Sequence, residues 1–413
     1  MTLAEIATQG WNVLAGDLPL PLAVLRRPAL EHNLNWFQRL MDSQGALLAP
    51  HGKTHMSPQL FALQERAGAW GVTVATVGQA LVYRAHGVKR ILLANQLIGP
   101  VEIQTILEEL AKDKHFDFYC LVDSLQGVRL LAEAAAKRGL PRPVQVLLEM
   151  GIPGQRCGVR TREEALTLAR AIASAPQLSL RGVEAFEGLI MTPDAAESAG
   201  KVDAFLDSLL GAAEQMAIEG LFGAGPVLLT AGGTAYYDRV LERLARADRP
   251  DSPLAGRAKR VVRSGCYLFH DDLFYQRLYK NIANRSGSAL PLATGPQPAL
   301  EVWAQVLSRP EPARAVLGVG KRDISFDIEL PLPLKWCRSG SGAKAILPMG
   351  EGVALAGLND QHGLLNVPAE HPLQVGDRVA LGVSHPCTTL DKWQVLMIVD
   401  ANYTVVDAVK TFF

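Results

Sequence analysis

The chain has 413 residues, with 41 lysines and arginines balanced by 41 aspartates and glutamates, so its formal net charge is zero. A balanced charge provides no field that would gather nucleic acid or an anionic membrane surface, and we expect a small-molecule partner. The length exceeds what one hydrophobic core usually supports, and it predicts two domains.

The five cysteines are odd in number, widely scattered and without C-x-x-C spacing, which argues against a disulfide framework and fits a reducing compartment. The start of the chain lacks the basic segment and apolar core of a secretory signal. No later run approaches the roughly 20 apolar residues that a membrane helix needs. We therefore expect a cytoplasmic protein.

Short apolar runs alternate with longer amphipathic segments from about residue 20 to residue 280. This alternation is typical of parallel strands joined by crossover helices. Without the first run, eight strands remain, which is the number that closes a (β/α)8 barrel of the TIM type. The predicted strands are 22–27, 46–51, 71–76, 90–95, 118–123, 144–150, 181–187, 227–232 and 260–266.

Nearly every predicted strand ends in a polar residue. A polar strand end is ordinary in any fold, but eight in one chain predict an active site, because such barrels build theirs at the carboxyl ends of the strands. These residues are Lys53, Thr76, Asn95, Asp123, Glu149, Glu187, Thr230 and Ser264.

After about residue 285 the pattern changes to β-rich runs broken by proline and glycine, and long helical periodicity ends. We predict a mostly antiparallel β domain over 285–413, after a barrel domain over 20–280. The linker is expected near 284–298, where serine, glycine and proline cluster. Residues 1–19 are expected to pack on the β domain.

Lys53 stands in the segment Pro50-His51-Gly52-Lys53-Thr54-His55, between an apolar run and a predicted helix that starts near Ser57-Pro58. A solitary lysine is most often a solvated surface cation. At the mouth of a barrel, however, we expect Lys53 to be partly removed from water, which is the condition that makes a lysine a nucleophile and a base.

Two glycine-bearing loops follow the last two predicted barrel strands, and barrel enzymes frequently bind phosphate at these loops. Glycine pairs are more often plain turns, so their position in the order of strands carries the prediction. The loops are Thr230-Ala231-Gly232-Gly233-Thr234 and Ser264-Gly265-Cys266-Tyr267.

His385 and Cys387 belong to the run Ser384-His385-Pro386-Cys387-Thr388-Thr389 in the predicted β domain. In an extended segment, residues two apart face the same side, so both could reach one metal ion. An imidazole with a thiolate suits zinc, although zinc normally takes more than two protein ligands. By itself an H-x-C triplet is more often structural than metal-binding.

Taken together, the motifs PHGKTH, GQRCGV (154–159), the glycine loop, SGCYLF and SHPC resemble the D-threonine aldolase and D-serine dehydratase family. The resemblance spans nearly the whole chain in the expected order. It implies fold-type III pyridoxal 5'-phosphate enzymes with an alanine-racemase-like barrel and a β domain. Relatives of this build are usually homodimers, and the resemblance implies the same here.

Carried over by position, the resemblance makes Lys53 the residue that holds pyridoxal phosphate as a Schiff base. The loops 232–234 and 265–267 would hold the phosphate, and His51 and Arg156 would lie near the ring. His385 and Cys387 resemble the metal ligands, zinc among the candidate ions, of the dehydratase branch, whereas the aldolase branch resembles H-x-D.

The segment Ala185-Phe186-Glu187-Gly188 departs from the family pattern. Relatives commonly show an aromatic–histidine pair before the glycine, usually with tyrosine. A phenolic hydroxyl near the cofactor is therefore missing, and Glu187 is a candidate to replace its function. We hypothesise that Glu187 reaches the pyridine nitrogen and strengthens the cofactor as an electron sink.

The expected reaction is dehydration of a D-3-hydroxy amino acid such as D-serine or D-threonine to a 2-oxo acid and ammonia. Metal-dependent retro-aldol cleavage to glycine and an aldehyde is the nearest alternative, because both reactions use the same bound geometry. A racemase ranks third, since no second acid or base can be assigned. A non-catalytic carrier of the cofactor is the alternative from a different class.

Overall fold

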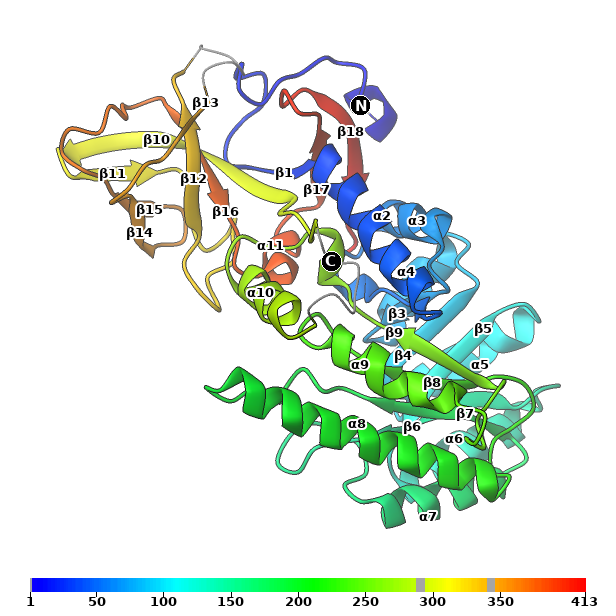
Figure 1. Ribbon diagram of the computed structural model, residues 1–413. Helices are drawn as coiled ribbons and strands as arrows, with labels where there is room; N and C mark the ends of the chain where they lie inside the picture. Colours follow the sequence, from blue (N-terminus) through cyan, green and yellow to red (C-terminus); the bar gives the residue numbers. More distant parts are fainter. Residues whose placement is uncertain (1, 287–293, 340–345) are drawn as a thin grey trace.

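The computed structural model describes residues 2–286, 294–339 and 346–413. Figure 1 shows two sheets, with helices packed around one of them and with α10 (Phe274–Ser286) and α11 (Pro386–Leu390) between the two. Within these residues no helix is long and apolar enough to cross a membrane.

The first sheet has eight strands, all parallel, in the order β2-β9-β8-β7-β6-β5-β4-β3. The sheet curls, and its two edge strands meet through a parallel bridge between His51 and Thr73. The predicted barrel is confirmed. Its strands are β2 (Leu47–Leu48), β3 (Val72–Val74), β4 (Arg90–Gln96), β5 (Asp117–Val122), β6 (Val144–Met150), β7 (Leu178–Ala185), β8 (Val227–Ala231) and β9 (Ala258–Val262).

Among the described residues eight helices accompany the barrel strands, and five of them begin at a residue whose side chain caps the helix. Ser57 accepts a hydrogen bond from the Leu60 N–H at 3.4 Å, and Pro58 takes the first helical position, as the sequence predicts. Thr76 and Ser124 cap the next helices in the same way. These helices are α2 (Arg27–Ser43), α3 (Pro58–Ala67), α4 (Val77–Ala85), α5 (Pro100–Lys112), α6 (Leu125–Arg138), α7 (Arg162–Ala173), α8 (Ala195–Ile218) and α9 (Tyr237–Leu244).

The second sheet is mostly antiparallel, as predicted, and runs in the order β13-β12-β16-β10-β1-β17-β18, with β11, β15 and β14 continuing from β10. Among the strand pairs of the described residues in this sheet, only that of β1 and β17 is parallel. The strands are β1 (Leu22–Arg26), β10 (Leu300–Glu311), β11 (Arg314–Leu317), β12 (Leu332–Cys337), β13 (Ile346–Pro348), β14 (Ala354–Leu358), β15 (Gly363–Asn366), β16 (Arg378–Gly382), β17 (Val395–Val399) and β18 (Val405–Lys410).

Strand β1 lies inside the range predicted for the barrel domain, yet it pairs with β10 and β17 of the second sheet. The N-terminal segment lies on the same sheet, since the Val13 N–H donates to the Tyr403 carbonyl at 3.1 Å. Of the predicted linker at 284–298, residues 287–293 lie outside the described residues, and 284–286 form the end of α10.

Asn33 of α2 joins three parts of the chain. Its side chain is fully buried; the amide donates to the carbonyls of Leu268 at 2.9 Å and Gln297 at 2.7 Å, and the Oδ1 atom accepts from the Gln297 N–H at 2.7 Å. Leu268 follows the second glycine-bearing loop, and Gln297 leads into β10. Asn33 therefore holds that loop and the start of the second sheet against α2.

We predict that Asn33→Ala lowers the free energy of unfolding by about 3 kcal/mol, because it leaves the buried Leu268 carbonyl and two partly buried backbone groups of Gln297 without partners. Urea unfolding followed by circular dichroism measures the change. The control is Asn35→Ala, an exposed position in the same helix, which should change the free energy by less than about 0.5 kcal/mol. Equal effects of the two substitutions would contradict this role of Asn33.

Candidate active site

A cavity of about 660 Å³ lies at the carboxyl ends of the barrel strands and reaches the second sheet. It brings together most residues that the sequence analysis selects, from both parts of the chain. Its lining includes His51, Lys53, Thr54, Asn95, Gln96, Glu149, Arg156, Cys157, Glu184, Phe186, Gly232, Gly233, Thr234, Arg263, Gly265, Cys266, Tyr275, His385 and Cys387.

Lys53 lies in a single 3-10 turn (Gly52–Thr54) directly after β2. The turn is fixed by the hydroxyl of Tyr83, which donates to the Gly52 carbonyl at 2.9 Å. A Cβ on Gly52 would lie 2.5 Å from that hydroxyl oxygen, so glycine is required there. Lys53 is exposed to solvent. The prediction that its amine is partly removed from water is therefore wrong for the chain without a cofactor.

His51 lies beside Lys53, and its Nδ1 atom has no hydrogen-bond partner among the described residues although the atom is buried. Burial lowers the pKa of this imidazole well below 6.5, and the nearby charges of Lys53 and Arg263 lower it further. His51 is therefore a neutral ring at neutral pH. Its unpartnered nitrogen is available to a polar group in the cavity.

Glu187 holds the first glycine-bearing loop. The side chain is fully buried, and its carboxylate accepts hydrogen bonds from the Gly232 N–H at 2.8 Å and the Gly233 N–H at 3.3 Å. Burial raises the pKa of Glu187, while its hydrogen bonds oppose the shift. Its carboxylate therefore binds the loop backbone and does not line the cavity. The hypothesis that Glu187 contacts a pyridine nitrogen is not supported by this position.

The second loop packs against the first and against the Lys53 turn. The hydroxyls of Thr234 and Ser264 lie 3.2 Å apart. A Cβ on Gly265 would lie 2.5 Å from the Thr54 hydroxyl oxygen and 2.7 Å from the His51 carbonyl oxygen, so this close approach requires glycine. The two loops and the lysine therefore form one continuous wall of the cavity.

This wall fits a cofactor with a phosphate and an aromatic ring. It offers the Thr234 hydroxyl, the backbone of the second loop at Gly265 and Cys266, an accessible amine at Lys53 and an unpartnered imidazole nitrogen at His51. The N–H groups of Gly232 and Gly233 already donate to Glu187. The guanidinium of Arg156 stacks over the Phe186 ring at 4.9 Å, at the edge of the same cavity. A phosphate prefers such donors, and a cofactor aldehyde requires the amine.

Two predicted cofactor-binding residues direct their side chains elsewhere. The Thr230 hydroxyl donates to the Val261 carbonyl at 2.9 Å, within the barrel sheet. The Tyr267 hydroxyl accepts from the Gln64 amide at 3.1 Å, and its ring stacks on Phe37. Both side chains belong to the core, so in these two loops the backbone and the neighbouring residues face the cavity.

Sequence reasoning missed a buried ion pair in the cavity wall. Arg263 forms an ion pair with Glu184, and it donates to the Ala185 carbonyl at 2.8 Å. Burial raises the pKa of Glu184, and Arg263 opposes that shift. Tyr275 of α10 also lines the cavity and was not selected. No spacing in the sequence links these residues to Lys53.

His385 and Cys387 meet the barrel at the cavity. The prediction of an extended segment is wrong beyond His385, because Pro386 starts α11, so that His385 is the residue before the helix and Cys387 lies in its first turn. The His385 Nδ1 atom lies 2.6 Å from the Asp327 carboxylate, which leaves the other ring nitrogen on the side of Cys387. Asp327 is a further residue that sequence reasoning missed.

The Cys387 sulfur lies 3.4 Å from the Cys266 sulfur and 3.5 Å from the Thr54 hydroxyl oxygen. Hydrogen bonds with Cys266, His385 and Thr54 lower the pKa of Cys387 well below 9, against the effect of burial. Cys387, and after it Asp327, raise the pKa of His385 to about 9 against the effect of burial. A thiolate beside an imidazole held by a carboxylate is a donor set that suits zinc.

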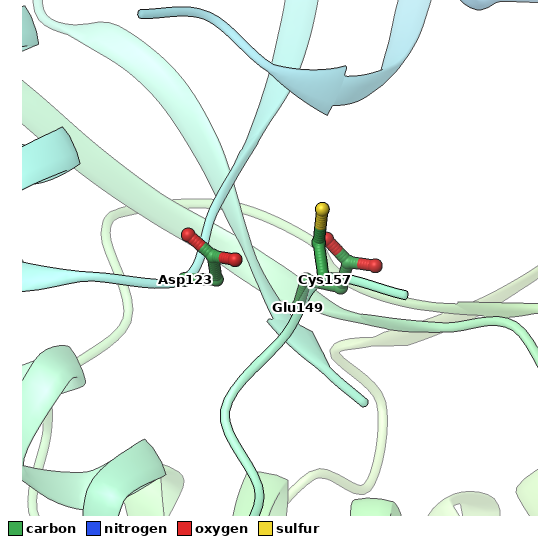
Figure 2. Close-up of side chains that lie close together, drawn as sticks. All are labelled: Asp123, Glu149 and Cys157. Carbon is green, nitrogen blue, oxygen red and sulfur yellow. The ribbon is translucent and has the colours of Figure 1, made fainter. Parts of the chain in front are cut away.

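A second group of possible metal ligands lies at the carboxyl ends of β5 and β6, and two of its members, Glu149 and Cys157, line the same cavity. Figure 2 shows Asp123, Glu149 and Cys157, whose donor atoms all lie within 4.8 Å of one another. Asp123 accepts from the Gly158 N–H at 3.0 Å, and it thereby anchors the loop that carries Cys157. Burial, followed by Glu184, raises the pKa of Glu149 to about 7.

Two family models match the chain. Residues 25–222 match "Alanine racemase, N-terminal domain", and residues 299–399 match "Putative serine dehydratase domain". A 3-hydroxy-D-aspartate aldolase from Paracoccus denitrificans (strain Pd 1222) is 26% identical over 92% of this chain and 88% of its own length. A D-threonine aldolase from an Arthrobacter species is also 26% identical, with the same two coverages.

Over most of its length the chain is similar to the D-threonine aldolase and D-serine dehydratase family of pyridoxal-phosphate-dependent lyases. One dehydratase of this family, the D-threo-3-hydroxyaspartate dehydratase of Delftia sp. (strain HT23), is 32% identical over 37% of the chain and 39% of its own length. Both reactions of the family therefore occur among its relatives.

Solved structures of the family share the fold. D-threonine aldolase from Filomicrobium marinum has a TM-score of 0.76 at 23% identity, over 96% of this chain and 95% of that one. A D-threo-3-hydroxyaspartate dehydratase has been solved as a cysteine-to-alanine mutant in the metal-free form, with a TM-score of 0.71 at 23% identity over 97% and 99% of the two chains. A histidine-to-alanine mutant has also been solved.

Glu149 gives a prediction for the dependence of stability on pH. Its folded pKa of about 7 lies above the ordinary value of 4.5, so the folded chain holds the proton more tightly and loses stability as the pH rises between these values. Glu149→Gln removes this loss. We expect the variant to be more stable than the wild type by about 3 kcal/mol at pH 8 and equally stable at pH 4.

Urea unfolding at the two pH values measures this difference. Glu65→Gln, at an exposed position of α3, is the control and should change stability little at either pH. A gain for Glu149→Gln that is the same at pH 4 and pH 8 would contradict the buried carboxyl group described here.

Proposed function

We propose that this chain is a dehydratase of D-3-hydroxy amino acids, such as D-serine or D-threonine, that releases ammonia and a 2-oxo acid. The observation that carries the proposal is that Lys53 and the His385–Cys387 pair line one cavity. A lysine supplies the base, and a metal pair supplies the means to remove a hydroxyl group. A protein that only carried the cofactor would need the lysine but not the metal-binding pair.

Pyridoxal phosphate would be held by Lys53, by the loops at Gly232–Thr234 and Gly265–Cys266, and by Arg156 and His51 beside its ring. When bound, this cofactor supplies an electron sink for the negative charge that develops at Cα. Glu187 fixes the first loop by accepting from the Gly232 and Gly233 N–H groups, so the donors to the phosphate would come from Thr234 and from the second loop.

The metal ion, for which we propose zinc, would be held by His385 and Cys387. When bound, it supplies a Lewis acid that makes the 3-hydroxyl a better leaving group. The metal-free cysteine mutant and the histidine mutant of the related dehydratase support this proposal, since the two mutated residues lie two positions apart, as His385 and Cys387 do. Asp327 would orient the imidazole through its Nδ1 atom.

Different residues of the chain would then carry out proton transfer and substrate binding. The exposed amine of Lys53 takes the proton from Cα. Arg156 stands at the entrance as a fixed cation that attracts the substrate carboxylate. The 3-hydroxyl leaves as water, and the remaining enamine takes up water to give the 2-oxo acid and ammonia, so that the substrate loses ammonia overall.

Retro-aldol cleavage is the second candidate, because three relatives that match 92% of the chain are aldolases. It would use the same bound substrate and would break the Cα–Cβ bond, which gives glycine and an aldehyde. The cysteine at position 387 favours dehydration, since the resemblance associates H-x-D with the aldolase branch. The two reactions are distinguished by their products.

The test is a product assay on protein loaded with pyridoxal phosphate and zinc and given D-serine or D-threonine. We expect ammonia and a 2-oxo acid in equal amounts, lost on treatment with a chelator and restored by zinc. Lys53→Ala should lower the rate roughly 10³-fold, because it removes the base. Lys89→Ala is the matched control and should keep the rate, because Lys89 is exposed and directly precedes the amino end of β4.

Formation of glycine and an aldehyde without ammonia would contradict dehydration and would show that the reaction is retro-aldol cleavage. Full activity in the presence of the chelator would contradict the role given to His385 and Cys387. Full activity of Lys53→Ala would contradict the whole assignment.

A further inference from the structure

We propose that Cys266 is a third protein ligand of the metal ion held by His385 and Cys387, so that the ion joins the barrel to the β domain. The proposal rests on the proposed function for the existence of that metal site. It adds a ligand from a different part of the chain, which the H-x-C motif does not contain.

The two sulfurs are already at the separation that a shared ion requires. Cys266 Sγ lies 3.4 Å from Cys387 Sγ, and both cysteines are free thiols. In a tetrahedral zinc site with zinc–sulfur bonds of about 2.3 Å, two thiolate ligands lie about 3.8 Å apart. For the two sulfurs a change of a few tenths of an ångström in position therefore suffices. The His385 ring nitrogen does not lie within 4.8 Å of both sulfurs, so the imidazole would also have to turn toward Cys266.

The backbone that carries each thiol is well fixed. Cys266 is 5% exposed and begins the short 3-10 helix η3 (Cys266–Leu268), directly after the glycine that packs on the Lys53 turn. Its carbonyl accepts from the His270 N–H at 2.8 Å. Cys387 is held in the first turn of α11. Both thiols line the cavity, which places an ion between them within reach of a substrate.

The number of ligands supports the same inference. A catalytic zinc ion usually has three protein ligands and an open fourth position, whereas His385 and Cys387 supply two. Adding Cys266 completes a set of two thiolates and one imidazole. Cys387 contacts both other donors, and Asp327 holds the far nitrogen of His385. The open position then faces the cavity, where a substrate hydroxyl would bind.

The group of Asp123, Glu149 and Cys157 is the competing location for a metal ion. It offers two carboxylates and an exposed cysteine, which is a harder and more solvated donor set. Two buried or half-buried sulfurs with an imidazole suit zinc better. Since each location contains a cysteine of its own, substitutions at Cys266 and Cys157 distinguish them.

The first experiment is X-ray absorption on the full-length wild-type protein loaded with zinc and pyridoxal phosphate, which counts the sulfurs bound to the ion. We expect two sulfur ligands at about 2.3 Å. This measurement needs no substitution and does not depend on turnover.

The second experiment replaces zinc by cobalt and compares Cys266→Ser with Cys157→Ser. In Cys266→Ser the sulfur-to-cobalt absorbance per bound ion should fall by about half, and the zinc dissociation constant measured by chelator competition should rise at least about 10-fold. Cys157→Ser should match the wild type in both measurements.

One sulfur in the wild type, with Cys266→Ser unchanged, would overturn the inference and leave His385 and Cys387 as the metal pair. Loss of the ion in Cys157→Ser, with Cys266→Ser unchanged, would overturn it in favour of the Asp123 group. A wild-type protein that binds neither zinc nor cobalt would overturn the metal part of the proposed function as well.

Discussion

The parallel direction of the eight barrel strands is the constraint on which the site depends. Because every strand points the same way, the residues that follow each of them gather at one rim. Lys53, Asp123, Glu149 and the glycine loops are far apart in the sequence, and this geometry alone brings them together. The bridge between His51 and Thr73 completes the ring of strands and fixes the Lys53 turn against its neighbour.

The second sheet adds the chemistry that the barrel rim lacks. The barrel offers an amine, arginines and loop backbone, all of which suit an anionic cofactor and a substrate carboxylate. The imidazole of His385 and the thiol of Cys387 are added at α11, which lies between the two sheets (Figure 1). The contact of Cys387 with Thr54 and Cys266 is therefore the point at which the two halves of the site meet.

The local features of the site could be predicted from the sequence. The barrel strands follow from alternating apolar runs, and Lys53 and the glycine loops follow from their position just after strands. The position of a residue near a strand end, however, does not give the direction of its side chain. Thr230 and Tyr267 consequently proved to point into the core, and the Glu187 carboxylate lies on the backbone of a loop.

Contacts between distant segments could not be predicted in this way. Asp327 is 58 residues before His385, and Cys266 is 121 residues before Cys387, so no local pattern links the members of either pair. Strand β1 likewise falls within the predicted barrel domain, because its apolar run is local information whereas its pairing with β10 is not. The sequence predicts an extended segment where α11 begins, because proline is common both at helix starts and in extended segments.

The most direct test of the central claim, that this cavity binds pyridoxal phosphate through Lys53, is to incubate the wild-type protein with the cofactor and reduce it with borohydride. Reduction fixes the cofactor on the lysine that holds it, and peptide mass spectrometry then identifies that lysine. The account predicts one modified peptide, which contains Lys53. Modification of another lysine, or of several exposed lysines to similar extents, would contradict it.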